Sequence, residues 1–290
     1  MTRRYLAVAL IAMAVVQLAA PQALAVLVQV TPSNLAGWSI DTYFTGGDPN
    51  YSGTFVTGPA TPPEGTGSVR LTVGADGGGA VKLHTNNFNG TLLSAISKLQ
   101  YSTYVTTNSG GTPQDDQQAP YVQIPVDWDN DGVYDDRLFF EPVYQTGTYS
   151  LVPGAGAIPD QRGGDGSAPK VGIWETYDIL AGGFWTENLG AGGPPLDTIA
   201  NYLSVYPNAK IVNSATAGGL QFVAGFGGPG DWGSFDGNVD AIVFETASSS
   251  VTYDFEVAAV PEASAMLFGG LACCASGIAY GVRRCRGRKA

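Results

Sequence analysis

Residues 121–141 read YVQIPVDWDNDGVYDDRLFFE, in which two apolar runs flank an acidic segment that contains a glycine. In the first run Val122, Ile124 and Val126 recur at every second position, which is the side-chain period of a β-strand. The second run, from Asp136 to Glu141, is also strand-like. The stretch therefore predicts a β-hairpin with the acidic segment at its tip.

The same period of two recurs on both sides of this hairpin. Val69, Leu71 and Val73 alternate with polar or basic residues. Further strand-like runs cover residues 99–105, 170–177, 220–226, 239–244 and 251–256, and turn clusters rich in Gly and Pro separate them, as at residues 46–50, 62–65 and 163–166. Many short strands between such turns predict an all-β sandwich.

Helical periodicity is confined to short segments. Ile199, Tyr202, Leu203 and Tyr206 fall at i, i+3, i+4 and i+7, with Asp197 as the expected N-cap and Pro207 after the end. Residues 92–96 form a second, weaker candidate. We expect one or two short helices beside the sandwich.

The N-terminus has the features of a secretory signal peptide. Arg3 and Arg4 precede an apolar run from residue 5 to 20, and Ala23 and Ala25 form a small-x-small cleavage site. The alternative, a first membrane span, is disfavoured by the short run and by the cleavage site. We expect residues 1–25 to be removed and the mature chain to start near Val26.

The C-terminal residues 260–290 combine three features. Val260, Pro261 and Glu262 come first, and an uncharged apolar run at residues 263–282 follows. As a helix this run is about 30 Å long, which matches the hydrocarbon core of a bilayer. The chain ends in a basic cluster, residues 283–289, which we expect to stay on the cytoplasmic side.

This arrangement resembles the PEP-CTERM sorting signal, which has a Val-Pro-Glu-Pro motif, a membrane helix and an Arg-rich end. Ala263 stands where the second proline of the motif usually falls. The resemblance implies recognition by an exosortase-type protease, cleavage near the motif, and delivery to the cell surface or the exopolysaccharide matrix. The alternative is a plain C-terminal membrane anchor.

Between these ends, residues 26–259 are acidic and contain no cysteine. This body has seven Lys and Arg against 24 Asp and Glu, a net charge of −17, and all three Cys lie in the tail. Such a charge repels nucleic acid and favours cation binding. The body therefore has no disulfide, and its length suits one large β domain.

The acidic segment has the ligand spacing of a calcium loop. Counted from Asp127, carboxylates fall at positions 1, 3, 5 and 9, and Gly132 at position 6 permits the sharp bend. Leu138 stands at position 12, so the segment is not an EF-hand. We expect Ca²⁺ to be bound by Asp127, Asp129, Asp131, Val133 and Asp135. The alternative is a solvated acidic turn.

A second candidate site is aromatic. Several aromatic residues, Phe184 and Phe235 among them, lie between Gly-rich stretches in the second half of the body. If exposed, they offer flat faces on which sugar rings stack, and if buried they fill the core. The candidate ligand-binding residues are Trp174, Tyr177, Trp185 and Trp232.

Several pieces of the body resemble uncharacterised secreted bacterial proteins that carry the same tail. They are residues 99–104, 137–142, 174–178, 237–240 and 253–256. The ending, a Gly-x-Val-Asp strand followed by Tyr-Asp-Phe-Glu, is similar to that of concanavalin-like lectin modules. The resemblance implies a jelly-roll β-sandwich and brings no catalytic residues.

Signals for an enzyme are weak. His84 is the only histidine and no nucleophile motif flanks it. A carboxylate pair for glycoside cleavage could come from Glu141, Glu175, Asp178 and Glu187. The sequence thus favours a non-catalytic surface or matrix protein that binds polysaccharide. The alternatives are a polysaccharide-acting enzyme and a purely structural matrix component.

Overall fold

A computed structural model of the chain describes residues 25–43, 50–75, 78–109, 118–147, 149–162, 170–189, 193–214, 218–226 and 232–258. The chain divides into two units, Met1–Val257 and Ala258–Ala290. The expected signal peptide, apart from Ala25, and the expected sorting tail with its membrane helix lie outside the described residues. Within the described residues, no helix has the length and apolarity needed to cross a membrane.

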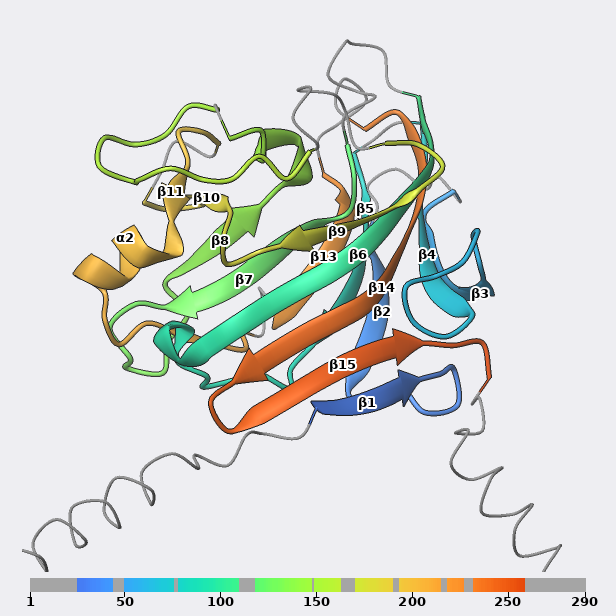
Figure 1. The fold of residues 1–290 in the computed structure, drawn as a ribbon, viewed down its shortest axis with the longest axis horizontal. Helices are drawn as coiled ribbons and strands as arrows, with labels where there is room; N and C mark the ends of the chain where they lie inside the picture. Colours follow the sequence, from blue (N-terminus) through green and yellow to red (C-terminus); the bar gives the residue numbers. More distant parts are fainter. Residues whose placement is uncertain are drawn as a thin grey trace, which may run out of the picture. The chain divides into compact units, whose positions relative to one another are not determined.

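The first unit is a sandwich of two β-sheets (Figure 1). Sheet I has seven strands. They are β1 (Ala25–Val30), β3 (Ser52–Thr57), β4 (Gly67–Val73), β6 (Ile96–Ser109), β9 (Trp174–Asp178), β14 (Ser234–Thr246) and β15 (Ser249–Phe255). Its pairings are antiparallel except for that of β1 with β15.

Sheet II has eight strands and lies behind sheet I in Figure 1. They are β2 (Trp38–Tyr43), β5 (Ala80–Thr85), β7 (Tyr121–Asp127), β8 (Asp136–Phe140), β10 (Gly183–Thr186), β11 (Asp197–Thr198), β12 (Lys210–Ile211) and β13 (Leu220–Gly225). β7 and β8 form the hairpin expected at residues 121–141. All pairings within this sheet are antiparallel.

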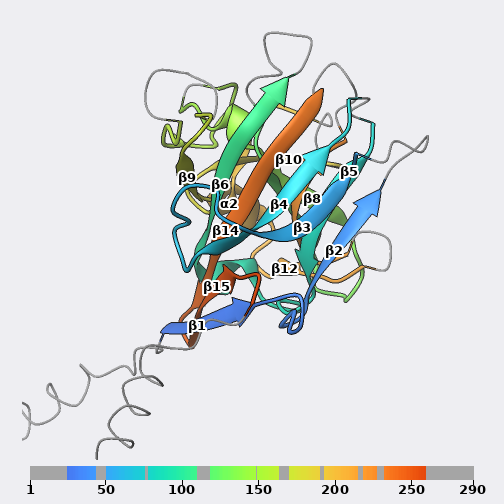
Figure 2. The same cartoon turned by 90° about the vertical axis from the view of Figure 1, so that its right-hand side faces the viewer.

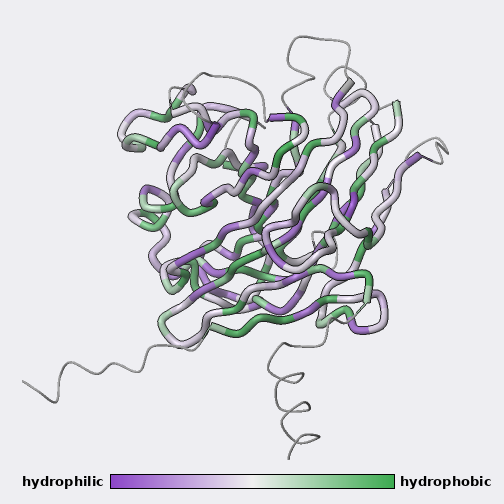
Figure 3. The backbone as a smooth tube through the Cα atoms, turned by 45° about the vertical axis from the view of Figure 1, so that its right-hand side comes forward, coloured by the Kyte–Doolittle hydropathy of each residue, from purple (hydrophilic) through white to green (hydrophobic). Residues whose placement is uncertain are grey.

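The core lies between the sheets and is filled by alternate side chains of the strands. Phe222 on β13 contacts Trp38 on β2, with ring centroids 6.0 Å apart, and Tyr101 on β6 of the other sheet at 5.1 Å. All three rings are buried. Figure 3 shows hydrophobic residues distributed along the strands of both sheets, as this packing requires.

The long strand β14 changes its neighbour part of the way along one edge. Its first half pairs with β4, its second half pairs with β15, and β6 follows its other edge (Figure 2). The change occurs at Asp240 and Ala241, where the register shifts and Ala241 has a φ of 51°. An L-residue with a positive φ bends the strand, and the bend lets β15 take the place of β4.

The helical segments are short, as expected. They are the α-helix α2 (Ile199–Val205) and the 3₁₀ helices η1 (Leu93–Ala95) and η3 (Pro142–Tyr144). The expected N-cap Asp197 was wrong by one residue. Thr198 caps α2 by accepting a hydrogen bond from Asn201 N at 3.3 Å, because the Asp197 carboxylate is taken up by Thr198 N and the Asn201 side chain.

The predicted all-β sandwich is confirmed, but one strand boundary differs and several strands were not predicted. The run expected at residues 170–177 enters the sheet only at Trp174. The strands that were not predicted are β1, β2, β3, β10, β11 and β12. The turn clusters at 46–49 and 163–166 lie outside the described residues.

Candidate functional site

A row of side chains crosses the outer face of sheet II. The strand registers place Trp185 opposite Phe139, Phe139 opposite Gln123, Gln123 opposite Gln221, and Gln221 opposite His84. Their neighbours Leu138, Val122 and Phe222 point into the core, so by the alternation of strands these residues point outward. The row therefore runs from aromatic groups on β10 and β8 to amide groups on β7 and β13.

A groove opens over the aromatic half of this row. It has a volume of about 430 Å³ and is formed mainly by β7, β8, β10 and the end of β13. Its described walls include Tyr121, Gln123, Arg137, Phe139, Glu141, Tyr144, Trp185 and Trp232. A volume of this size is typical of a site that binds a small molecule or a few units of a polymer.

The aromatic walls are held rigidly. The rings of Phe139 and Trp185 stack with centroids 3.8 Å apart and planes 1° apart. Trp185 Nε1 donates a hydrogen bond to Glu141 Oε1 at 3.0 Å, which fixes the indole orientation. Tyr121 stacks on Phe139 with ring centroids 6.5 Å apart and packs against Trp232 at 6.0 Å. These rings present an ordered apolar surface to the groove.

Some polar atoms of the groove have no hydrogen-bond partner among the residues that the structure describes. Gln123 is 1% exposed, and its Oε1 has no hydrogen-bond partner among the described residues, whereas its Nε2 donates to Tyr121 Oη at 3.1 Å. Arg137 Nε likewise has no partner there. A buried polar atom without a partner is costly, so an acceptor and a donor in one groove indicate a site for a hydroxylated ligand or ordered water.

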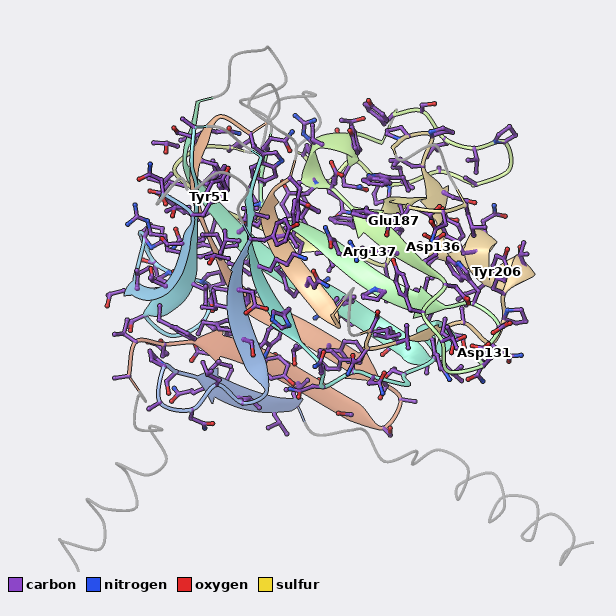
Figure 4. The ribbon with its side chains drawn as sticks, turned by 180° about the vertical axis from the view of Figure 1, so that it is seen from behind. Tyr51, Asp131, Asp136, Arg137, Glu187 and Tyr206 are labelled. Carbon is purple, nitrogen blue, oxygen red and sulfur yellow. The ribbon has the colours of Figure 1, made fainter. Side chains whose placement is uncertain are left out.

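The charges of the groove are mixed. Arg137 lies at 5.8 Å from the centre of the Phe139 ring, and Glu141 is the one carboxylate among the described wall residues. Figure 4 looks onto this face and shows Arg137 close to Asp136 and Glu187. Burial, together with the nearby Glu141 carboxylate, raises the pKa of Tyr121 well above its ordinary value, so this phenol stays protonated.

The four aromatic candidates from the sequence separate into three environments. Trp185 and Trp232 line the groove. Tyr177 is fully buried in the core, where it stacks on Tyr101 at 5.7 Å. Trp174 lies in sheet I, where it packs against Tyr104 and donates from Nε1 to Pro59 O at 3.0 Å. The structure thus brings only the first two into one site.

The acidic segment between β7 and β8 folds around its first residue. Asp127, which is buried, accepts hydrogen bonds from Asn130 N and Gly132 N, both at 2.7 Å. Asp127, Asp129 and Asp135 each bring one carboxylate oxygen within 4.8 Å of the others. Three converging carboxylates are a fitting donor set for Ca²⁺.

The remaining expected calcium ligands are placed differently. Asp131 uses its Oδ1 to accept from Val133 N at 2.8 Å, and it is not in the converging group. The Lys210 ammonium lies 3.2 Å from Asp127 Oδ2 and supplies a positive charge there. Burial alone raises the pKa of Asp127, but the hydrogen bonds from Gly132 and Lys210 outweigh it and hold that pKa below its ordinary value.

The carboxylates considered for glycoside cleavage are dispersed. Glu141 lies in the groove, whereas Glu175 and Asp178 belong to β9 in sheet I. Glu187 follows β10 and accepts a hydrogen bond from Tyr134 Oη at 2.8 Å. His84 pairs with the exposed Asp41 at 2.8 Å.

Gln123, Arg137 and Phe139 were not singled out from the sequence. They alternate with the apolar residues of β7 and β8, and this alternation was the available signal for an outward-facing row. No protein-family model, no curated protein and no solved structure matches this chain. Because one fold can serve many functions, the function of this chain has to be inferred from the residues of its site.

Proposed function

We propose that this protein is an exported, non-catalytic protein of the cell surface or extracellular matrix that binds a saccharide in the groove of sheet II. The main support is the position of Gln123 Oε1, which has no hydrogen-bond partner among the described residues, on the strand next to the stacked pair of Phe139 and Trp185. A sugar has apolar C–H faces that pack against aromatic rings and hydroxyl groups that donate to such an oxygen.

The other groups of the groove fit the same ligand. Arg137 offers donors to sugar oxygens, and Glu141 is already engaged by Trp185 and so serves to orient the indole. Cleavage of a glycosidic bond needs two facing carboxylates. The described wall carries one, which supports binding over hydrolysis.

Glycan-array binding of the full chain tests this function. Trp185→Ala is expected to reduce binding at least tenfold without changing the circular dichroism spectrum. Trp174→Ala is the matched control, because this tryptophan lies in sheet I and lines no part of the groove. A silent array, or equal loss in both variants, contradicts a saccharide site in the groove and favours a purely structural matrix role.

We also propose the jelly-roll type for the sandwich. The chain passes repeatedly between the sheets, with β2 in sheet II, β3 and β4 in sheet I, β5 in sheet II and β6 in sheet I. Export through a signal peptide at 1–25, and sorting by an exosortase-type protease at Val260, Pro261 and Glu262, belong to the same proposal. Mass spectrometry of the cell-associated protein tests them: the expected chain starts near Val26 and ends near Pro261.

The acidic segment supports a further part of the proposal, a Ca²⁺-stabilised loop. Its support is the convergence of Asp127, Asp129 and Asp135. Calorimetric titration of the full chain with CaCl₂ should lose one binding event in Asp129→Asn. An unchanged titration in this variant contradicts a site in the loop.

A further inference from the structure

Two cationic side chains flank the groove of sheet II, and each lies against one of its aromatic walls. The guanidinium carbon of Arg137 is 5.8 Å from the centre of the Phe139 ring, and Lys82 Nζ is 5.1 Å from the centre of the Phe226 ring. Both rings line the groove. Pairing through β13 places Lys82 in the same outward row as Tyr121, another wall residue. The groove thus has one cation on its β8 side and one on its β5 side.

Positive charge is scarce in the rest of the body. Residues 26–259 contain only seven Lys and Arg. The arginine on β4 pairs with Asp236 at 2.6 Å, and the lysine on β12 pairs with Asp127 at 3.2 Å. Neither Lys82 nor Arg137 forms an ion pair with another described residue. Two of the few cations are therefore placed beside the groove without a carboxylate partner there.

The two carboxylates that Figure 4 shows close to Arg137 are held by other donors. Asp136 accepts from backbone N atoms of the segment after β10 at 2.8 and 3.1 Å, and Glu187 accepts from a tyrosine hydroxyl at 2.8 Å. Glu141, on the groove wall, accepts from the indole beside it at 3.0 Å. The Nε of Arg137 has no hydrogen-bond partner among the described residues. The guanidinium thus keeps donors for a ligand.

Holding the two cations near each other is energetically unfavourable. Both side chains are half-buried. Burial, followed by repulsion from Arg137, lowers the pKa of Lys82 below its ordinary value, while the exposed Asp41 acts in the opposite direction. Like charges that are partly removed from water repel each other more strongly than in solution. An anion bound between them relieves this repulsion.

The net charge of −17 on the body does not prevent an anion from binding at this place. At an ionic strength of 0.15 M the Debye length is about 8 Å, so exposed charges farther away are largely screened. The local charges then decide the interaction. Among the described residues they are Arg137 and Lys82 beside the aromatic walls, and Glu141, which already accepts from the indole.

We infer that the saccharide bound in the groove is acidic, and that its anionic group, a carboxylate or a sulfate, lies between Arg137 and Lys82. This inference rests on the function proposed above and names the class of ligand. A guanidinium binds an oxyanion such as a carboxylate through two parallel hydrogen bonds, and an ammonium adds a point charge. The apolar face of the sugar packs on the stacked pair of Phe139 and Trp185.

A glycan array with matched neutral, uronate-containing and sulfated oligosaccharides tests the inference on the full chain. The expected result is binding to acidic members at least tenfold tighter than to their neutral counterparts, and the two acidic arms distinguish a carboxylate from a sulfate. Equal binding to neutral and acidic members, or a preference for neutral ones, overturns the inference and leaves the proposed saccharide site in place. A silent array overturns both.

Charge-removing variants, measured by calorimetry with the tightest acidic member and its neutral counterpart, locate the anionic group. Arg137→Gln should raise the Kd of the acidic ligand at least tenfold and change that of the neutral one far less. Lys82→Met should act in the same way and keeps the test valid if Arg137→Gln does not fold, because Met retains an apolar stem against the Phe226 ring.

Arg70→Gln is the matched control, because it removes the same charge from sheet I, where Arg70 pairs with Asp236 at 2.6 Å. It should leave the ratio of the two Kd values unchanged. Raising the NaCl concentration should weaken the acidic complex of the parent chain more than the neutral one. An unchanged ratio in Arg137→Gln and Lys82→Met, or an equal change in Arg70→Gln, overturns the inference.

Discussion

Lys210 on β12 holds its ammonium nitrogen 3.2 Å from Oδ2 of the buried Asp127, the last residue of β7. The same ammonium donates to the Asn130 side chain. A single lysine thus joins the short strand β12 to the first carboxylate of the acidic segment. Its charge also competes with any ion that the segment binds.

Replacing Lys210 with Met separates these two effects. Without calcium, the free energy of unfolding is expected to fall by about 2 kcal/mol, because a buried carboxylate loses its charged partner. In the presence of CaCl₂ the loss should shrink, since the ion takes over the neutralisation. Urea denaturation with and without calcium measures both.

Lys170→Met is the control for this experiment. Lys170 is exposed, so its replacement should change the free energy of unfolding by less than about 0.5 kcal/mol. Equal stability of Lys210→Met and the parent chain in calcium-free buffer would contradict the role assigned to the ion pair.

The buried carboxylates of Asp240 and Asp254 predict that the free energy of unfolding falls as the pH rises. Burial, followed by interactions with neighbouring carboxylates, raises the pKa of Asp254 to about 6, and burial raises that of Asp240 to about 7. Because these pKa values exceed those of the unfolded chain, the contribution is full below about pH 4 and is lost as pH rises through 6 and 7.

In a chelating buffer the free energy of unfolding should therefore be about 2 kcal/mol lower at pH 8 than at pH 5. Denaturant titrations at the two pH values measure the difference. Asp254→Asn should reduce it, since the amide does not titrate, whereas Asp236→Asn should not. A parent chain that is more stable at pH 8 would contradict the assignment.

The burial of Phe222 between the two sheets allows us to predict how much stability is lost when the core is disturbed. Its ring contacts Trp38 of its own sheet and Tyr101 of the opposite sheet. Phe222→Ala should lower the free energy of unfolding by about 4 kcal/mol, because it leaves a cavity that both sheets border. Phe226→Ala, at a side chain that is 40% exposed, should cost far less. Similar losses in both variants would show that the sheets are not joined through Phe222.

The class of fold could be predicted because strand periodicity is a local property. The core between the sheets contains the side chains of Val122, Ile124 and Val126, as their spacing indicates. The N-cap of α2 could not be fixed in the same way. Asp197 and Thr198 are both good caps, and the N-cap is the one that accepts from the backbone N of Asn201 after folding, which is Thr198.

The candidate site was only partly predictable because it is assembled by pairing between distant strands. Trp185 and Trp232 could be proposed from their residue type. Gln123 can be assigned to the same site only when the pairing of β7 with β8 and β13 is known. The contact of Glu64 with the buried Asp240 has the same origin. Glu64 reaches Asp240 across 176 positions of the chain, which no local spacing reveals.

The substitution Gln123→Leu is expected to weaken saccharide binding without lowering the free energy of unfolding. Replacing the glutamine with Leu keeps the size of the side chain and removes an amide oxygen that has no hydrogen-bond partner in the described part of the chain. The free energy of unfolding should stay the same or rise by about 1 kcal/mol, because a buried polar atom is lost. Saccharide binding, measured by calorimetry with a ligand identified on the array, should weaken at least tenfold.

Gln100→Leu is the control, since this glutamine lies on β6 of sheet I and donates to Asp178. It should leave saccharide binding unchanged. The combination expected for Gln123→Leu, a weaker complex in a protein that is no less stable, identifies the amide as a ligand contact. A parallel loss of stability and binding would instead mean that Gln123 supports the sheet through Tyr121, whose hydroxyl it contacts at 3.1 Å.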